Sequence, residues 1–166
     1  MRTLYLIRHA KSSWSNTDLH DFERPLNERG LADAPKMGKR LKEKEVYPDL
    51  MLSSPAVRAL TTCKSISSIL GYPVEQIKTD RDLYHADEDA LLSAIQNLED
   101  HHKIVCLFGH NPGITEFANQ LFDIYIDNIP TAGIIAGNLP VEHWSDAQFK
   151  CGKFLFFDFP KRNIRE

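Results

Sequence analysis

The chain has no hydrophobic run long enough to cross a membrane. A transmembrane helix needs roughly 18–20 consecutive apolar residues, and no stretch approaches that length. The apolar run that follows Thr3 spans only Leu4–Ile7, which is short for the core of a secretion signal. From these two absences we expect no membrane association and a cytoplasmic location.

Cysteine is scarce and positive charge is not in excess. Cys63, Cys106 and Cys151 are odd in number, widely spaced and set in apolar or helical surroundings, which favours reduced packing residues over a disulfide frame or a metal site. A net charge of -3 provides no general attraction to nucleic acid or anionic lipid. An anion site would therefore have to be a local cluster of cations.

The sequence also lacks repeats, low-complexity tracts and linkers. Its 166 residues are ordinary for one globular domain with a sizeable core, and we treat 1–166 as a single domain. Strands are expected over residues 3–8, 49–53, 76–79, 103–108, 133–139 and 153–159, and helices over about 27–45, 54–70, 90–98 and 113–122. This alternation predicts an α/β fold: a three-layer α/β/α sandwich with a mostly parallel central sheet and an antiparallel edge strand.

Several residues mark the expected helices. Pro35 should kink the first helix or delay its regular start. Ser54 is the predicted N-cap of the second helix, with Pro55 at its first position and Gly71 as its C-cap. The spacing of apolar residues predicts that two stripes are buried: Leu31, Ala34, Met37, Gly38 and Leu41 in the first helix, and Val57, Leu60, Ile66, Ile69 and Leu70 in the second.

The first strand ends in Arg8-His9. A neutral imidazole can attack phosphorus at neutral pH without a separate activating base. A neighbouring guanidinium suits the non-bridging oxygens of a phosphoryl group. The same two residues also fit an ordinary polar strand end, so their meaning depends on what lies beside them.

Two other strand ends carry anion-binding side chains. The second strand leads through Ser53–Pro55 into a helix that carries Arg58, and the strand over 103–108 leads into Gly109-His110-Asn111. In open α/β sheets, ligands bind beyond the carboxyl ends of the strands. Helix N-termini there add free N–H groups and partial positive charge. Parallel packing would bring these ends and Arg8-His9 together.

These segments resemble the histidine phosphatase superfamily and, within it, the small SixA-type phosphohistidine phosphatases. The matching motifs, in order, are Arg8–Ser12, Arg24–Gly30, Ser53–Ala59 with Thr62, Gly109–Gly113 and Pro130–Gly133. They cover nearly the whole chain. The resemblance implies a phosphatase that needs no metal and no other cofactor.

The resemblance also implies roles for individual residues. His9 would be the nucleophile that forms a covalent phosphohistidine, and nearby cations would keep it neutral by lowering its pKa. Arg8, Arg58 and His110 would surround the phosphoryl oxygens and stabilise the charge of the transition state. Three further residues are expected to contact phosphate: Lys11, Ser12 and Asn111.

The sequence departs from the superfamily pattern at three positions. Ala10 stands where a glycine is usual, which indicates an ordinary backbone there. Asn111 stands where the phytase-like branch has an acid. His85 stands nearest in the sequence to the position where the mutase-like branch has a glutamate. The general acid is therefore open among His85, its flanking residues and the carboxylates of the first loop: Asp82, Asp87, Asp18, Asp21 and Glu23.

A site without a firm acid suits a phosphoramidate better than a phosphoester. We therefore expect a phosphohistidine phosphatase acting on a phosphorylated protein of the histidine-phosphotransfer type. The alternatives are a phosphatase of small phosphoesters, a phosphoglycerate mutase and a catalytically silent phospho-binding module. We expect no nucleic-acid partner, and we leave open the oligomeric state and whether loop 10–25 closes on substrate. His101-His102 are expected to be solvated, and Trp14, Trp144 and the aromatics of 154–159 to pack.

Overall fold

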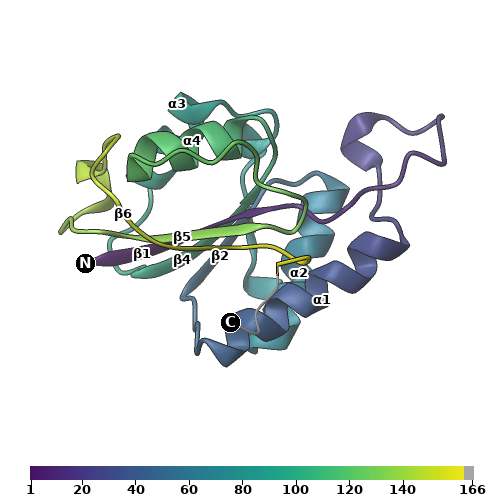
Figure 1. Cartoon of the computed structure of the whole chain (residues 1–166), viewed down its shortest axis with the longest axis horizontal. Coiled ribbons are helices and arrows are strands. Elements are labelled where there is room, and N and C mark those ends of the chain that lie inside the picture. Colours follow the sequence, from purple (N-terminus) through teal and green to yellow (C-terminus); the bar gives the residue numbers. More distant parts are fainter. Residues whose placement is uncertain (163–166) are drawn as a thin grey trace.

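Six strands form one sheet in the computed structural model, which describes residues 1–162 (Figure 1). The strands are β1 (Arg2–Arg8), β2 (Leu50–Ser53), β3 (Lys78–Thr79), β4 (Ile104–Gly109), β5 (Ile134–Leu139) and β6 (Lys153–Asp158). Their order across the sheet is β3-β2-β4-β1-β5-β6, and the first four run parallel. The reversed strand is β5, one place in from the edge, and β6 pairs antiparallel with it.

Helices cover both faces of this sheet. They are α1 (Glu28–Glu43), α2 (Val57–Leu70), α3 (Glu88–Gln96) and α4 (Gly113–Phe122), joined by the short 3-10 helices η1 (Asp21–Glu23), η2 (Val74–Gln76), η3 (Arg81–Leu83) and η4 (Trp144–Asp146). Figure 1 shows α1 and α2 on one face and α3 and α4 on the other. The predicted three-layer α/β/α fold with a mostly parallel sheet is therefore confirmed.

Both faces of β1 are buried, because successive side chains of a strand point to opposite sides of the sheet. Leu4 and Leu6 belong to the apolar cluster beneath α3 and α4. Tyr5 and Ile7 belong to the cluster beneath α1 and α2. A continuous apolar run was therefore the correct signal for an interior strand of this sheet.

One predicted feature of α1 is wrong, and a second is decided only in part. The helix begins at Glu28 and continues through Pro35, so its regular start is not delayed, and a kink at Pro35 stays a prediction. Asn27 sets the start, since its side chain accepts a hydrogen bond from the backbone N–H of Gly30. Leu31 is 57% exposed instead of buried, because the packed face of α1 is the one that carries Ala34, Met37 and Leu41.

The α2 helix begins later in the chain than predicted, and Ser54 is not its N-cap. The helix begins at Val57 with Ala56 as its N-cap. The hydroxyl of Ser54 instead accepts from the Ala56 N–H at 3.2 Å within the turn before the helix. The buried face is rotated relative to the predicted stripe, so that Val57 is exposed and Arg58 is buried. The predicted C-cap is confirmed, because Gly71 has a φ of 77°.

Three further predictions concern single side chains. Trp144 is fully buried as expected, but Trp14 and Phe154 are exposed. His102 is also buried, with Nδ1 3.8 Å from a carboxylate oxygen of Asp49, so the expectation of two solvated histidines fails for this one. The backbone carbonyl of His102 accepts a hydrogen bond from the indole N–H of Trp144, a long-range contact that periodicity could not indicate. Its neighbour His101 is exposed.

The three cysteines carry no disulfide: Cys63 and Cys106 are buried, and Cys151 is partly buried. Within residues 1–162, no group of three or more His, Cys, Asp and Glu side chains is arranged to hold a metal ion. No helix in that range is both long and apolar enough to span a bilayer.

Candidate active site

One pocket, of about 290 Å³, opens at the carboxyl ends of β1, β2 and β4. The register of the sheet brings these ends together, because Arg8 pairs with Gly109 and Ser53 pairs with Phe108. All eight residues predicted for the site line the pocket: Arg8, His9, Lys11, Ser12, Arg58, His85, His110 and Asn111. Four others complete its wall: Trp14, Asp21, Arg24 and Thr131.

His9 is buried just beyond the end of β1, with 7% of its surface exposed. Its Nδ1 lies 2.7 Å from the carbonyl oxygen of Ala10. Because a carbonyl only accepts, Nδ1 carries the proton and Nε2 keeps its lone pair. The Ala10 N–H in turn donates to the hydroxyl of Thr62 on α2. Ala10 is not among the positive-φ residues of the described chain, so the expectation of an ordinary backbone there is confirmed.

His9 is also held in its neutral form. Burial lowers its pKa to about 4, and the positive charges of Arg58 and Arg8 act in the same direction, against an opposing effect of the Ala10 hydrogen bond. A neutral imidazole with a free Nε2 is the nucleophilic form of histidine.

His110 follows β4, and its ring lies 5.2 Å from that of His9. Burial, His9 and Arg58 together lower the pKa of His110 to about 3. Its Nε2 is 2.8 Å from the hydroxyl of Ser54. When that hydroxyl donates to Nε2, the proton of the neutral ring lies on Nδ1. This Nδ1 is buried and has no hydrogen-bond partner among the described residues.

Arg8 and Arg58, like His110, are held by hydrogen bonds on one part of the side chain and have, on another, a buried nitrogen without a partner in the described part of the chain. The Nη1 of Arg8 donates to the carbonyl of Ile129 at 2.9 Å, and the terminal nitrogens of Arg58 donate to Asp21. The Nε atoms of both arginines are buried without a partner in residues 1–162. Leaving a buried donor unpaired is costly. The terminal nitrogens of both arginines keep further N–H groups that an oxyanion in the pocket would satisfy, and phosphate offers several acceptor oxygens at once.

Asn111 supports the pocket through its own hydrogen bonds. Its Nδ2 donates to Asn128 and to the carbonyl of Ile129, and its Oδ1 accepts from the Thr115 hydroxyl at 2.6 Å. The Ile129 carbonyl is the same group that anchors Arg8. Asn111 therefore stabilises the segment that positions an arginine, and its role toward phosphate stays a prediction.

Sequence reasoning did not assign Arg24 or Trp14 to the site. Arg24 is 7% exposed, and its guanidinium carbon lies 3.4 Å from the centre of the Trp14 ring. The first loop doubles back on itself, because Asn27 N–H donates to the carbonyl of Lys11. A Cβ at Gly30 would lie only 2.1 Å from that carbonyl, so the close approach needs glycine. The motif Arg24–Gly30 indicated that this segment belongs to the site. The path by which the first loop returns to it could not be predicted from the sequence.

The carboxylate candidates for the general acid do not carry a proton into the pocket. Asp87 caps α3 by accepting from Ala90 N–H, and Asp18 and Glu23 are exposed away from the lining. Burial would raise the pKa of Asp21, but the hydroxyl of Tyr84 and the charge of Arg58 outweigh it and lower that pKa to about 2. Asp21 is therefore ionised at neutral pH and cannot donate a proton.

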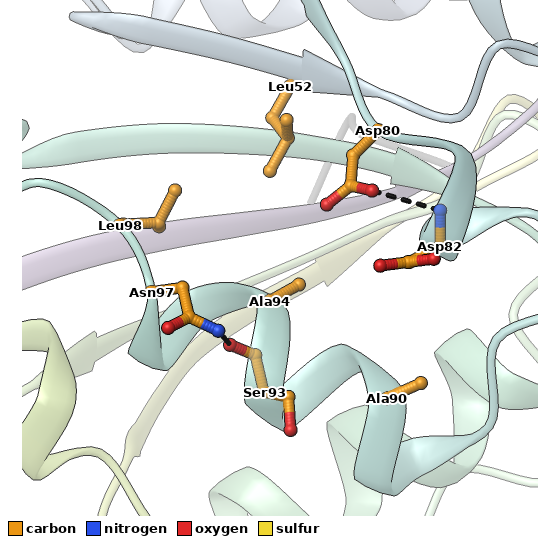
Figure 2. Close-up of a pocket in the computed structure, with 8 residues that line it drawn as sticks. All are labelled: Leu52, Asp80, Asp82, Ala90, Ser93, Ala94, Asn97 and Leu98. Atoms are coloured by element: carbon orange, nitrogen blue, oxygen red, sulfur yellow. Dashed lines mark hydrogen bonds between the residues drawn. The ribbon is translucent and has the colours of Figure 1, made fainter.

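Asp82 faces a different cavity. Figure 2 shows it with Asp80 across from residues of α3, in a pocket of about 450 Å³ that also has Leu52 in its wall. The Asp80 carboxylate accepts from the Asp82 N–H and fixes η3 in this orientation. His85, by contrast, lies in the lining of the His9 pocket with its ring 3.9 Å from that of Tyr84. It has a φ of 60°, which turns the chain sharply at the pocket mouth.

Comparison with known proteins places this arrangement in a family. Residues 4–89 match the sequence profile of the histidine phosphatase superfamily (branch 1). The chain is 35% identical over 129 residues to an uncharacterized chloroplastic protein of Arabidopsis thaliana, and 36% identical over 88 residues to a 2,3-bisphosphoglycerate-dependent phosphoglycerate mutase of Brucella ovis. These matches cover 72% and 52% of the chain but only 59% and 43% of those relatives, so the chain spans roughly half of their length.

Solved structures extend the comparison to nearly the whole chain. The crystal structure of a protein assigned as the phosphohistidine phosphatase SixA of Agrobacterium tumefaciens is similar with a TM-score of 0.80 at 27% identity, covering 96% of this chain and 98% of that one. The protein histidine phosphatase SixA complexed with tungstate has the same fold, with a TM-score of 0.80 at 21% identity over 95% and 97% of the two chains. The chain therefore belongs to the histidine phosphatase superfamily, and its fold is that of the SixA structures.

Proposed function

We propose that the protein is a phosphatase that removes phosphoryl groups from phosphohistidine in proteins, through a covalent intermediate on His9. One observation carries the proposal: the hydrogen bond from Nδ1 of His9 to the Ala10 carbonyl leaves a neutral Nε2 free in a pocket lined by Arg8, Arg58 and His110. The likeness to SixA structures supports the choice of phosphohistidine as substrate. A cytoplasmic location belongs to the same proposal.

In the first step, Nε2 of His9 forms a bond to phosphorus as the bond from phosphorus to the substrate nitrogen breaks. The leaving imidazole keeps the bonding electron pair and is protonated by solvent or by the substrate itself. Arg8, Arg58 and the Nδ1–H of His110 donate to the three phosphoryl oxygens, whose charge is spread in the transition state. The Ala10 carbonyl stabilises the positive charge that His9 gains.

In the second step, water attacks phosphorus and the bond to Nε2 breaks. The electron pair returns to the imidazole, which becomes neutral again, and inorganic phosphate leaves. No carboxylate is required in either step if the leaving group is an imidazole. A serine or sugar alkoxide, in contrast, needs a donor, and His85 is the candidate that lines the pocket.

The position of His85 at the mouth of the pocket favours a second candidate function, a phosphatase of small phosphoesters. A catalytically silent phospho-binding module is less well supported, because binding alone needs the arginines but not a neutral, oriented His9. The natural partner would be a phosphorylated protein of the histidine-phosphotransfer type in the first case and a small phosphorylated molecule in the second.

Substrate comparison tests the proposal. We expect kcat/KM on a phosphorylated histidine-phosphotransfer domain to exceed that on a phosphoserine peptide by about 100-fold or more, because only the ester needs a strong general acid. The same assays with His85→Gln should lower ester turnover by about tenfold or more and leave phosphohistidine turnover nearly unchanged. A chelator should have no effect on either rate. Comparable wild-type rates on the two substrates would show that the assignment to phosphohistidine is wrong.

The depressed pKa of His9 predicts how stability depends on pH. The unfolded chain binds a proton on His9 at pH values below about 6.5, whereas the folded chain does so only below about pH 4. Unfolding free energy should therefore fall on acidification through this window, and His9 accounts for about 3 kcal/mol of the loss. Urea unfolding from pH 7 to pH 4 measures it. His9→Gln should lose correspondingly less, and parallel curves for the two proteins would contradict the assignment.

A further inference from the structure

Asp21 is the acceptor for two of the four cationic side chains that line the pocket. Arg58 donates to it twice, from Nη1 to the backbone carbonyl at 2.6 Å and from Nη2 to Oδ2 at 2.9 Å. Arg24 donates from Nε to Oδ1 at 3.2 Å, and the Tyr84 hydroxyl donates to Oδ2 at 2.6 Å. Each terminal nitrogen of Arg58, on α2, thus donates one hydrogen to the same residue of the first loop.

The charge of Asp21 is isolated among positive charges. Arg8, Lys11, Arg24 and Arg58 line the pocket, and Asp21 is the single carboxylate among the described residues of that lining. Its side chain is ionised at neutral pH, as the low pKa indicates. An incoming phosphoryl group therefore meets an anion that already holds two of the guanidinium groups.

We propose that Asp21 is a positioning residue of the phosphoryl site: an internal counter-anion that fixes the Arg58 guanidinium and limits the affinity of the pocket for free phosphate. This inference rests on the proposed phosphatase function. Nη1 and Nη2 of Arg58 each donate one of their two hydrogens to Asp21, so the second N–H of each terminal nitrogen stays available for a substrate oxygen. The negative charge also opposes retention of the dianionic product, so that phosphate leaves more readily.

Replacing Asp21 by asparagine separates these effects from a loss of local structure. Asparagine has the same shape and keeps one acceptor oxygen, and the Arg58 contact to the backbone carbonyl is unaffected. We expect Asp21→Asn to tighten inhibition by inorganic phosphate about five- to tenfold, because one opposing charge is lost from a partly exposed site. We expect kcat on an aryl phosphate to fall about tenfold, because Arg58 loses its orientation and product release slows. A purely structural role would weaken phosphate binding instead.

Matched variants complete the experiment. Asp18→Asn makes the same charge change in the same loop, on an exposed residue outside the lining, and should alter both constants less than about twofold. Asp21→Ser should tighten phosphate binding as Asp21→Asn does, so the test holds if one of the two is unstable. Asp21→Glu keeps the charge, so its affinity for phosphate should equal that of the wild type. Its kcat should be lower than the wild-type value.

The outcomes distinguish this inference from the function on which it rests. A wild-type protein that is folded but neither hydrolyses the aryl phosphate nor binds phosphate would count against the proposed function. An active wild type, with weaker or unchanged phosphate inhibition in both neutral Asp21 variants, would overturn the role of Asp21 alone.

Discussion

Replacing His9 by glutamine should reduce turnover of an aryl phosphate by about 10⁴-fold or more, because the reaction loses its nucleophile and no neighbouring group can replace it. Wild-type protein quenched during turnover should carry an acid-labile phosphoryl group on His9, which mass spectrometry of the peptide identifies. The variant should carry none. The side chain is buried in the pocket wall, and glutamine fills a similar volume, so the fold should persist.

His101→Gln is the matched control, since that histidine is exposed and lies outside the pocket lining. Its activity should equal that of the wild type. The His9 variant should still bind phosphate or tungstate through Arg8, Arg58 and His110, which separates loss of chemistry from loss of the site. Full activity without His9 would rule out the covalent mechanism. Binding with no turnover in the wild type would instead identify a phospho-binding module.

Arg58→Lys should lower kcat/KM by about 10²- to 10³-fold, the second largest effect we expect. Arg58 is 5% exposed and uses one hydrogen of each terminal nitrogen to hold Asp21, which leaves a second N–H on each for a phosphoryl oxygen. A lysine ammonium is a single point of charge, so it cannot bind Asp21 and a phosphoryl oxygen at the same time in fixed geometry. Steady-state kinetics on the aryl phosphate and the inhibition constant of tungstate measure the change.

Arg29→Lys is the control for this experiment, because Arg29 is half exposed and its ion pair with Asp33 lies on the surface of α1. It should leave kcat/KM within about twofold of the wild type. Retention of more than about a third of the activity by Arg58→Lys would show that Arg58 supplies charge alone and that its shape is unimportant.

The sequence by itself determined the core of the fold and of the site. Continuous apolar runs mark β1 and β4 as interior strands, and polar residues placed directly after them must reach the carboxyl edge of the sheet. The placement of Arg8, His9 and His110 at this edge follows from that rule alone. Arg58 follows too, because it lies in the first turn of the helix after β2.

Only the tertiary structure decided what surrounds these residues. Asp21, Arg24 and Trp14 enter the pocket because the first loop doubles back over Gly30, a path that no local periodicity encodes. Asp82 leaves the candidates for general acid because η3 turns it toward a separate cavity. Strand ends are positioned by backbone pairing, which local sequence patterns predict. Loop side chains are positioned by long-range contacts, and these form only when the whole chain is packed.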